Sequence, residues 1–132
     1  CFPAYGKVFG KSIEGNLGAG GVDPTTPAMK AYRKAHMEVT GKPADGWASA
    51  NTYVSLQVLE QAIEGVGSVD RKAVTQYIKD NTFKTIMGDI NFVDQVSHRF
   101  WTVGQWQGGE FYGVASKGMP NAKPVILKKG WK

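Results

Sequence analysis

The stretch Trp47–Val66, WASANTYVSLQVLEQAIEGV, decides the fold because its apolar residues repeat with the period of a helix. One face of the expected helix carries Trp47, Ala50, Val54, Val58 and Ala62. A second apolar strip beside it consists of Tyr53, Leu56, Leu59 and Ile63, while Glu60 and Glu64 mark the solvent side. A helix with so wide an apolar surface must be covered from more than one side, so it needs partners.

A further helix is expected on each side of the central one. Before it, Thr25 or Thr26 can cap a helix that begins at Pro27 and ends at Gly41. Its expected apolar stripe is Met29, Tyr32, His36 and Val39. After it, Asp70 or Ser68 can cap a shorter helix whose apolar face is Val74, Tyr77 and Ile78. Residues 24–80 are therefore expected to form three consecutive helices with no strand among them.

From Phe83 onward the period changes to that of β-structure. Ile86, Gly88, Ile90 and Phe92 alternate with Met87, Asp89 and Asn91, which predicts a strand. A hairpin is expected from Arg99–Trp106 and Glu110–Ala115, and aromatic residues on both of its faces predict cover on both sides. The tail 120–132, rich in Pro and Lys, is expected to lie along the surface.

Residues 1–22 are loosely patterned and rich in glycine, and alternation around Ser12–Leu17 predicts one edge or crossing strand. Three helices followed by three strands make a poor closed domain, because a three-stranded antiparallel piece cannot bury helices with such wide apolar faces. We therefore expect partner structure, either from chain upstream of Cys1 or from another subunit.

The composition limits the possible functions. The formal charge is +5, but basic residues are spread along the 132 residues and only the tail is dense, so nucleic-acid binding is kept as a remote alternative. No apolar run approaches the ~20 residues of a membrane span, and the first residues have no signal-peptide pattern. Cys1 is the single cysteine, so it cannot form an internal disulfide.

The sequence has no recognisable catalytic, metal or cofactor motif. It contains no Gly-x-Ser-x-Gly elbow and no Cys–His pair at suitable positions. The glycine-rich stretch 18–21 does not open a helix at the distance that a phosphate-cradling loop requires. His36 and His98 have no partner at metal-ligand spacing, and Asp89 and Asp94 have no evident catalytic partner. We expect a protein that is not an enzyme and that binds no metal and no cofactor.

An ordered set of short segments carries a resemblance to a known family. These segments are MKAYRK (29–34), GKP (41–43), WASANTY (47–53), VLEQAIE (58–64), GSVDR (67–71), FKT (83–85), GDINF (88–92), VGQWQGGEF (103–111), Lys123-Pro124 and Trp131. Over about residues 14–132 the chain resembles the C-terminal third of the type I periplasmic binding proteins, in the leucine/isoleucine/valine-binding branch that serves ABC importers. The family usually has Asp directly after the position of Phe92 and Gly shortly after it, whereas this chain has Val93 and then no glycine before Gly104.

The resemblance implies an α/β fold: the C-terminal portion of a two-lobe (Venus-flytrap) protein, with three helices followed by a crossing strand and a β-hairpin. Residues 1–22 would be a lobe-crossing segment, residues 23–82 the helices of the N-terminal lobe, and residues 83–132 the crossing strand, hairpin and tail of the C-terminal lobe. Met87, Gly88 and Asp89 would act at the hinge.

The implied function is that of a periplasmic solute-binding component that closes around a small ligand and presents it to a membrane permease. The ligand would be a branched-chain or other amino acid, or an aromatic acid. The family often has an aromatic side chain at the start of the central helix, a position that falls at Ala48 with Trp47 directly before it. Trp47 would then be an apolar wall of the site, and Phe2 and Tyr5 would line the cleft from the other lobe. Ordinary core packing remains the alternative for all three aromatic residues.

A second function stays open at this point. The same fold could serve as the ligand-sensing module of a receptor or regulator, and a fused signalling domain would distinguish that case from an importer.

Overall fold

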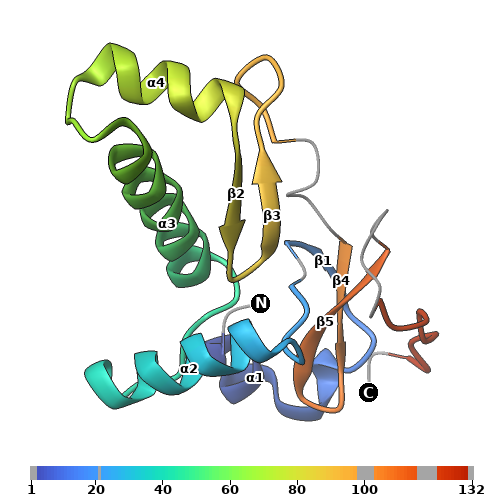
Figure 1. The fold of residues 1–132 in the computed structure, drawn as a ribbon. Helices are drawn as coiled ribbons and strands as arrows, with labels where there is room; N and C mark the ends of the chain where they lie inside the picture. The colour runs from blue at the N-terminus through green and yellow to red at the C-terminus, as the bar shows by residue number, and fades with distance from the viewer. Residues whose placement is uncertain (1–2, 21, 98–102, 116–121, 131–132) are drawn as a thin grey trace.

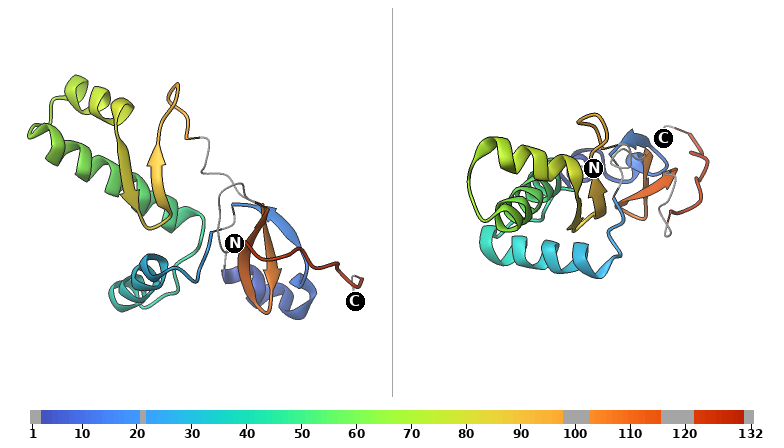
Figure 2. Two further views of the ribbon diagram at one scale, coloured as in Figure 1. Left: turned by 45° about the vertical axis from the view of Figure 1, so that its right-hand side comes forward. Right: turned by 45° about the horizontal axis from the view of Figure 1, so that its top comes forward.

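The computed structural model describes residues 3–20, 22–97, 103–115 and 122–130. In chain order its elements are α1 (Pro3–Phe9), the 3-10 helix η1 (Gly10–Ile13), β1 (Leu17–Ala19), α2 (Pro27–Thr40), α3 (Ala48–Val66), α4 (Arg71–Asp80), β2 (Thr82–Thr85), β3 (Gly88–Asn91), β4 (Val103–Gln107) and β5 (Glu110–Ala115). They gather in two groups (Figures 1 and 2). The helical group consists of α2, α3, α4 and the β2–β3 hairpin, and the sheet group consists of α1, η1 and the sheet β1–β4–β5.

The three predicted helices are confirmed, together with two of their caps. The Thr26 hydroxyl accepts a hydrogen bond from the Met29 amide at 3.1 Å at the start of α2. The Asp70 carboxylate accepts one from the Ala73 amide at 2.9 Å at the start of α4. These bonds satisfy amide groups that have no partner within the first turn of a helix, so the local sequence sets where both helices begin.

The core of the helical group is built on α3, as expected. Its buried residues are Ala50, Val54, Val58 and Ala62. The first half of this face packs against Met29 and Tyr32 of α2, and the second half packs against Val74 of α4 and Phe83 of β2. The second apolar strip behaves differently, because Tyr53, Leu56 and Leu59 are exposed. Within the strip, Tyr53 contacts the Tyr32 ring at a centroid distance of 4.9 Å and Ile63 packs against the core around Val58, so the strip is covered only in part.

The predicted apolar stripe of α2 is wrong at its C-terminal end. Met29 and Tyr32 are buried, whereas Val39 is 85% exposed. Only the N-terminal half of α2 contributes to the core around α3, and the last turn extends beyond that contact. His36 is half-buried and its Nδ1 lies 3.0 Å from the Lys42 carbonyl oxygen, which agrees with a packed histidine.

The single strand predicted over 86–92 is also wrong in its extent, because the chain forms a hairpin there. Strand β2 pairs with β3 in antiparallel register, with Phe83 opposite Ile90. Thr85 closes the turn: its hydroxyl donates to the Gly88 carbonyl at 2.7 Å and accepts from the Met87 amide at 3.1 Å. Alternation alone does not reveal this turn, because the residues within it continue the alternating pattern.

Two glutamines of α3 hold the outer edge of β2, and we call them the glutamine clamp. The Gln61 amide donates to the Lys84 carbonyl at 2.9 Å and accepts from the Lys84 amide at 3.2 Å. Gln57 accepts from the Ile86 amide at 3.0 Å. The clamp therefore gives this strand the pairing that a neighbouring strand would otherwise provide.

The segment after β3 turns without glycine, at the point where the chain departs from the family pattern. Asp94 and Gln95 have φ values of 51° and 66°. The flanking residues Val93 and Val96 exchange two backbone hydrogen bonds of 2.9 Å. Two residues with side chains thus occupy the left-handed region that glycine adopts more easily.

The sheet group confirms the predicted hairpin β4–β5. Its turn residues Gly108 and Gly109 both have positive φ, 63° and 83°, as a tight hairpin turn requires. Both carboxylate oxygens of Glu14 accept from the Gly108 amide, at 3.0 and 2.9 Å. Residues 98–102 are outside the described residues, so the start of the predicted strand Arg99–Trp106, with its aromatic residues, is not described.

The beginning of the chain differs from the prediction, which had no helix there and one strand around Ser12–Leu17. Instead α1 and η1 come first, and β1 begins at Leu17 and pairs with β4. Tyr5 and Phe9 are one helical turn apart and their ring centroids lie 4.8 Å from each other. This aromatic spacing and Pro3 at the first helical position were the available signals for α1.

The tail lies along the sheet group through side-chain hydrogen bonds. Gln105 is 1% exposed. Its amide donates to the carbonyls of Gly15 and Ile126, both at 2.8 Å, and accepts from the Ile126 amide at 2.9 Å. The expectation of a surface tail is confirmed for residues 122–130, which form neither helix nor strand.

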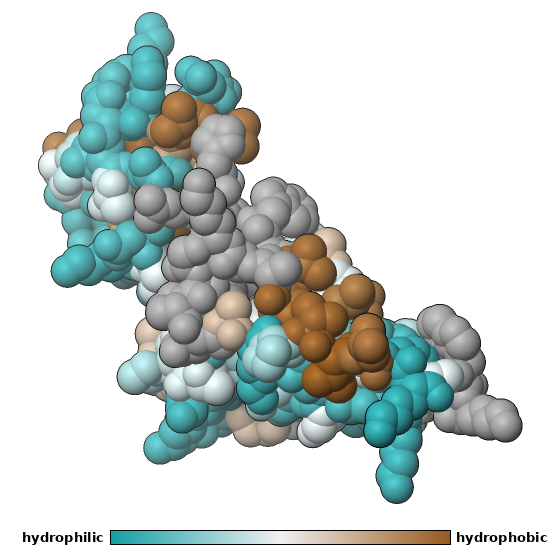
Figure 3. All heavy atoms as spheres, turned by 90° about the vertical axis from the view of Figure 1, so that its right-hand side faces the viewer, coloured by the Kyte–Doolittle hydropathy of each residue, from teal (hydrophilic) through white to brown (hydrophobic). Residues whose placement is uncertain are grey.

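Figure 3 shows a hydrophobic area on the side of the molecule where the sheet group and tail lie. Exposed apolar side chains of these elements include Leu17, Val103 and Leu127. This surface and the exposed strip on α3 agree with the expectation that the apolar faces exceed what the described residues can bury.

Candidate binding site

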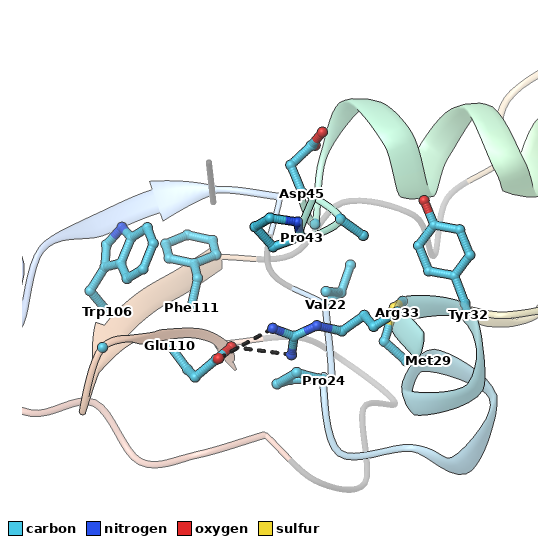
Figure 4. Close-up of a pocket in the computed structure, with 13 residues that line it drawn as sticks. Val22, Pro24, Met29, Tyr32, Arg33, Pro43, Asp45, Trp106, Glu110 and Phe111 are labelled. Carbon is cyan, nitrogen blue, oxygen red and sulfur yellow. Dashed lines mark hydrogen bonds and ion pairs between the residues drawn. The ribbon is translucent and has the colours of Figure 1, made fainter. Parts of the chain in front are cut away.

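A cavity of about 180 Å³ lies where the helical group meets the sheet group (Figure 4). Its wall is formed by four parts of the chain: the segment before α2, α2 itself, the loop before α3, and the hairpin β4–β5. The lining residues are Val22, Pro24, Met29, Tyr32, Arg33, Pro43, Ala44, Asp45, Gly46, Trp106, Gly109, Glu110 and Phe111. Aromatic side chains thus reach the cavity from both groups.

Arg33 and Glu110 form an ion pair across this cavity. The two guanidinium nitrogens Nη1 and Nη2 each donate to one carboxylate oxygen at 3.2 Å. The side chains are 38% and 46% exposed, so the pair stands at the rim rather than in the interior. Each charge is neutralised by the other, which leaves the wall of the cavity mainly apolar and aromatic.

The loop before α3 is fixed by Asp45. Its Oδ1 accepts from the Trp47 amide at 2.9 Å, and both carboxylate oxygens lie within 3.3 Å of the Ser49 amide. Asp45 therefore caps α3 from three residues before its first helical residue, whereas Trp47, which directly precedes the helix, makes no side-chain capping bond. This arrangement holds the cavity-lining residues Asp45 and Gly46 in place.

The predicted site residue Trp47 directly follows this part of the wall. Its ring lies against Gly20, at the end of β1, and its side chain is half-buried. Ala48 is the first residue of α3 and is exposed. Neither residue is among those that line the cavity, but the lining residue Gly46 is the direct neighbour of Trp47. A ligand role for either residue stays a prediction.

The aromatic residues predicted at the start of the chain lie on the sheet-group side. Phe2 is outside the described residues. The Tyr5 hydroxyl accepts from the Asn16 side-chain amide at 3.1 Å, and its ring centroid lies 6.0 Å from that of Trp106. Trp106 lines the cavity, so Tyr5 contacts a residue of its wall without lining it.

The predicted hinge residues lie in the β2–β3 hairpin. Met87 belongs to the turn, and Gly88 and Asp89 are the first two residues of β3. They are not brought together with the cavity, whose wall contains none of them. Their hinge role stays a prediction.

Sequence reasoning missed the residues that the structure brings together at the cavity. Arg33 and Glu110 are 77 positions apart, and nothing in the sequence pairs them. Trp106 and Phe111 are predicted only as members of the hairpin. In the described part of the chain, no group of three His, Cys, Asp or Glu side chains could hold a metal ion, and none of the helices is long and apolar enough to span a membrane. The cavity is small, and its wall combines aromatic side chains with one ion pair.

Comparisons with known proteins place this geometry in a family. The model of the family described as periplasmic binding protein matches residues 8–110. No curated protein sequence matches the chain. Among solved structures, a leucine-binding protein from Thermotoga maritima is 25% identical with a TM-score of 0.65, and the match covers 86% of this chain and 33% of that chain.

Two further solved structures have the same fold at lower identity. The leucine-, isoleucine-, valine-, threonine- and alanine-binding protein from Brucella ovis, in its closed conformation, is 21% identical with a TM-score of 0.69 and 94% and 36% coverage of the two chains. A solute-binding protein of an ABC transporter from R. palustris, in complex with benzoate, is 15% identical with a TM-score of 0.66 and 91% and 33% coverage. The chain spans about a third of the length of these proteins.

The family match covers most of the chain, and the structural matches cover 86% and 94% of it. The chain therefore belongs to the periplasmic binding protein family, and its mixed α/β structure corresponds to part of the type I fold of the leucine-binding proteins.

Proposed function

We propose that these residues are the C-terminal part of a periplasmic solute-binding component of an ABC importer, which delivers a small ligand to a membrane permease and catalyses no reaction. The supporting observation is the cavity between the helical and sheet groups, with aromatic walls from both. A site shared by two groups of elements is what binding by closure requires, because a ligand that touches both stabilises the conformation in which they are close.

The proposed division into lobes follows from the same resemblance. The helices would belong to the N-terminal lobe and the hairpin β4–β5 to the C-terminal lobe, with residues 1–22 and 84–92 as crossing segments. Chain upstream of Cys1 would supply the remaining parts of both lobes and most polar contacts to the ligand. In support of this division, α2 and α3 share one core, while β1 pairs with β4.

The proposed ligand is an amino acid with an apolar side chain, or an aromatic acid. Tyr32, Trp106 and Phe111 line the cavity, and Trp47 stands beside its lining. Such walls favour an apolar or planar group by burying its surface, at roughly 25 cal/mol per Å² removed from water. Related proteins were solved with leucine and with benzoate, which represent the two ligand classes.

The test is calorimetric titration and thermal unfolding of the chain as its gene encodes it. The ligand panel is L-leucine, L-isoleucine, L-valine, L-phenylalanine and benzoate, with a disaccharide as the unrelated control. At a free ligand concentration of 100 times Kd, the free energy of unfolding should rise by about 2.7 kcal/mol. Absence of both a heat signal and a rise in Tm for the whole panel would overturn the proposal.

A variant of Trp47 tests whether this predicted wall residue takes part in ligand binding. Trp47→Ala should weaken binding of the ligand identified in the panel by about tenfold or more, since large aromatic residues contribute most at such sites. Leu59→Ala removes an apolar group from the exposed strip of α3 and should leave the affinity unchanged. Equal affinities for the two variants would assign Trp47 to core packing.

A further inference from the structure

Gly20 and Trp47 meet at a point where no side chain fits on Gly20. A Cβ atom built on Gly20 would overlap Cε3 and Cζ3 of the Trp47 indole and would lie 3.3 Å from its Cδ2. Gly20 is buried, and its φ of +86° lies in the region that side-chain-bearing residues rarely adopt. The position thus requires glycine for two independent reasons, one of the backbone and one of space.

This contact connects the two groups of elements. Gly20 directly follows β1, which pairs with β4 in the sheet group. Trp47 directly precedes α3, the central helix of the helical group. The Cε3–Cζ3 edge of the indole therefore abuts the backbone of the segment that runs from one group to the other.

The backbone of Trp47 is held on its other side. Its amide donates to Asp45 Oδ1 at 2.9 Å, and its carbonyl accepts from the Asn51 amide at 3.0 Å in the first turn of α3. With its backbone held in this way, the indole avoids an atom at position 20 by rotating its side chain. The residue directly before Trp47, Gly46, lines the cavity, so such a rotation takes place next to a lining residue.

We propose that Gly20 is a positioning residue for the Trp47 indole and thereby helps to determine which ligands the site accepts. This inference rests on the proposed binding function. The absence of a side chain at position 20 lets the Cε3–Cζ3 edge of the ring approach the segment between the groups, where the indole stands beside the cavity-lining residue Gly46. A methyl group there would turn the ring away from this place and change the space available to a ligand.

The test compares two glycines of similar backbone conformation. Gly20→Ala introduces both backbone strain and overlap with the indole. Gly67→Ala is the matched control, because Gly67 has φ +68° with nothing within 4 Å of the added Cβ. Both variants are made in the chain as its gene encodes it and titrated with L-leucine and with benzoate.

Gly20→Ala should weaken binding of the accepted probe by about tenfold or more and alter the ratio of the two affinities, whereas Gly67→Ala should leave both unchanged. The double variant Gly20→Ala/Trp47→Ala should bind no more weakly than Trp47→Ala, because the overlap is then gone. The thermal unfolding temperature of Gly20→Ala should also recover in part when Trp47 is removed.

The outcomes separate the two proposals. If the unmodified chain binds neither probe nor any other member of the panel, the proposed function fails and this inference fails with it. If the unmodified chain binds a probe but Gly20→Ala behaves like Gly67→Ala, only the inference is overturned. Additive losses in the double variant would likewise overturn it, because independent effects mean that Gly20 does not act through Trp47.

Discussion

Arg33 of α2 and Glu110 of β5 form a two-point ion pair that joins the helical group to the sheet group. The planar guanidinium matches the carboxylate at both oxygens, which fixes orientation as well as distance. The pair is partly open to solvent, so it adds little to overall stability, and its main effect is to fix the orientation of the two groups relative to each other.

The coupling between these two residues is measurable by a double-variant cycle. Arg33→Ala, Glu110→Ala and the double variant should give a coupling of about 0.5–1 kcal/mol in the free energy of unfolding, and less in high salt. Lys34 and Glu38 provide the control, because they lie 3.9 Å apart on the exposed surface of α2. Their coupling should be smaller than that of Arg33 and Glu110. Equal couplings would contradict a specific link between the groups.

Substitution of Gln105 should reduce stability more than substitution of most other polar residues in the sheet group. Gln105→Leu leaves the carbonyls of Gly15 and Ile126 without their donor, and we expect a loss of about 2–4 kcal/mol in the free energy of unfolding. The tail should also become a better trypsin substrate at Lys128 and Lys129. Gln76→Leu removes an exposed hydrogen bond to Asp80 and serves as the control, with a change within about 0.5 kcal/mol. A Gln105→Leu variant with unchanged proteolysis would show that the tail is held by other contacts.

Thr26 should stabilise the start of α2 through its hydroxyl. Thr26→Ala removes the bond to the Met29 amide and should cost about 1 kcal/mol, measured by urea unfolding, whereas Thr26→Ser should retain most of the stability. Thr52 lies exposed within α3, so Thr52→Ala should be neutral or slightly stabilising. If Thr26→Ser is as unstable as Thr26→Ala, the hydroxyl is not the cause.

Replacing Gln95 by glycine should make the protein more stable. Its φ of 66° costs a side-chain-bearing residue about 1–2 kcal/mol of folded-state free energy. Glycine removes this cost, but it also raises the conformational entropy of the unfolded chain, so only part of the cost is recovered as stability. We expect Gln95→Gly to raise the free energy of unfolding by up to about 1 kcal/mol. Gln95→Ala keeps the unfavourable conformation and is the control, and a glycine variant no more stable than the alanine variant would contradict this account.

The helices could be predicted because the signals that define them are local. Helices α2 and α4 are each capped by one of the two residues that the sequence offered, Thr26 rather than Thr25 and Asp70 rather than Ser68. The α3 face from Ala50 to Ala62 is buried as its spacing indicates. The β2–β3 turn was missed because it depends on the Thr85 hydroxyl and on Gln57 and Gln61, which belong to another element.

The candidate site was predictable only in part. The position of Trp47 came from the start of α3 and from the family resemblance, but its contact with Gly20 joins two residues that are distant in the sequence. The same holds for Arg33 and Glu110, whose approach depends on how the two groups pack. Pairings of this kind depend on tertiary structure, which a single sequence does not encode as a periodic pattern.

The glutamine clamp has a consequence for how this protein avoids self-association. An outer strand with free amide and carbonyl groups is a template onto which another polypeptide can add, and this is a common start of aggregation. Here the amide and carbonyl of Lys84 are already occupied by the Gln61 side chain. The outer side of β2 at Lys84 is therefore closed by a side chain of the protein's own central helix.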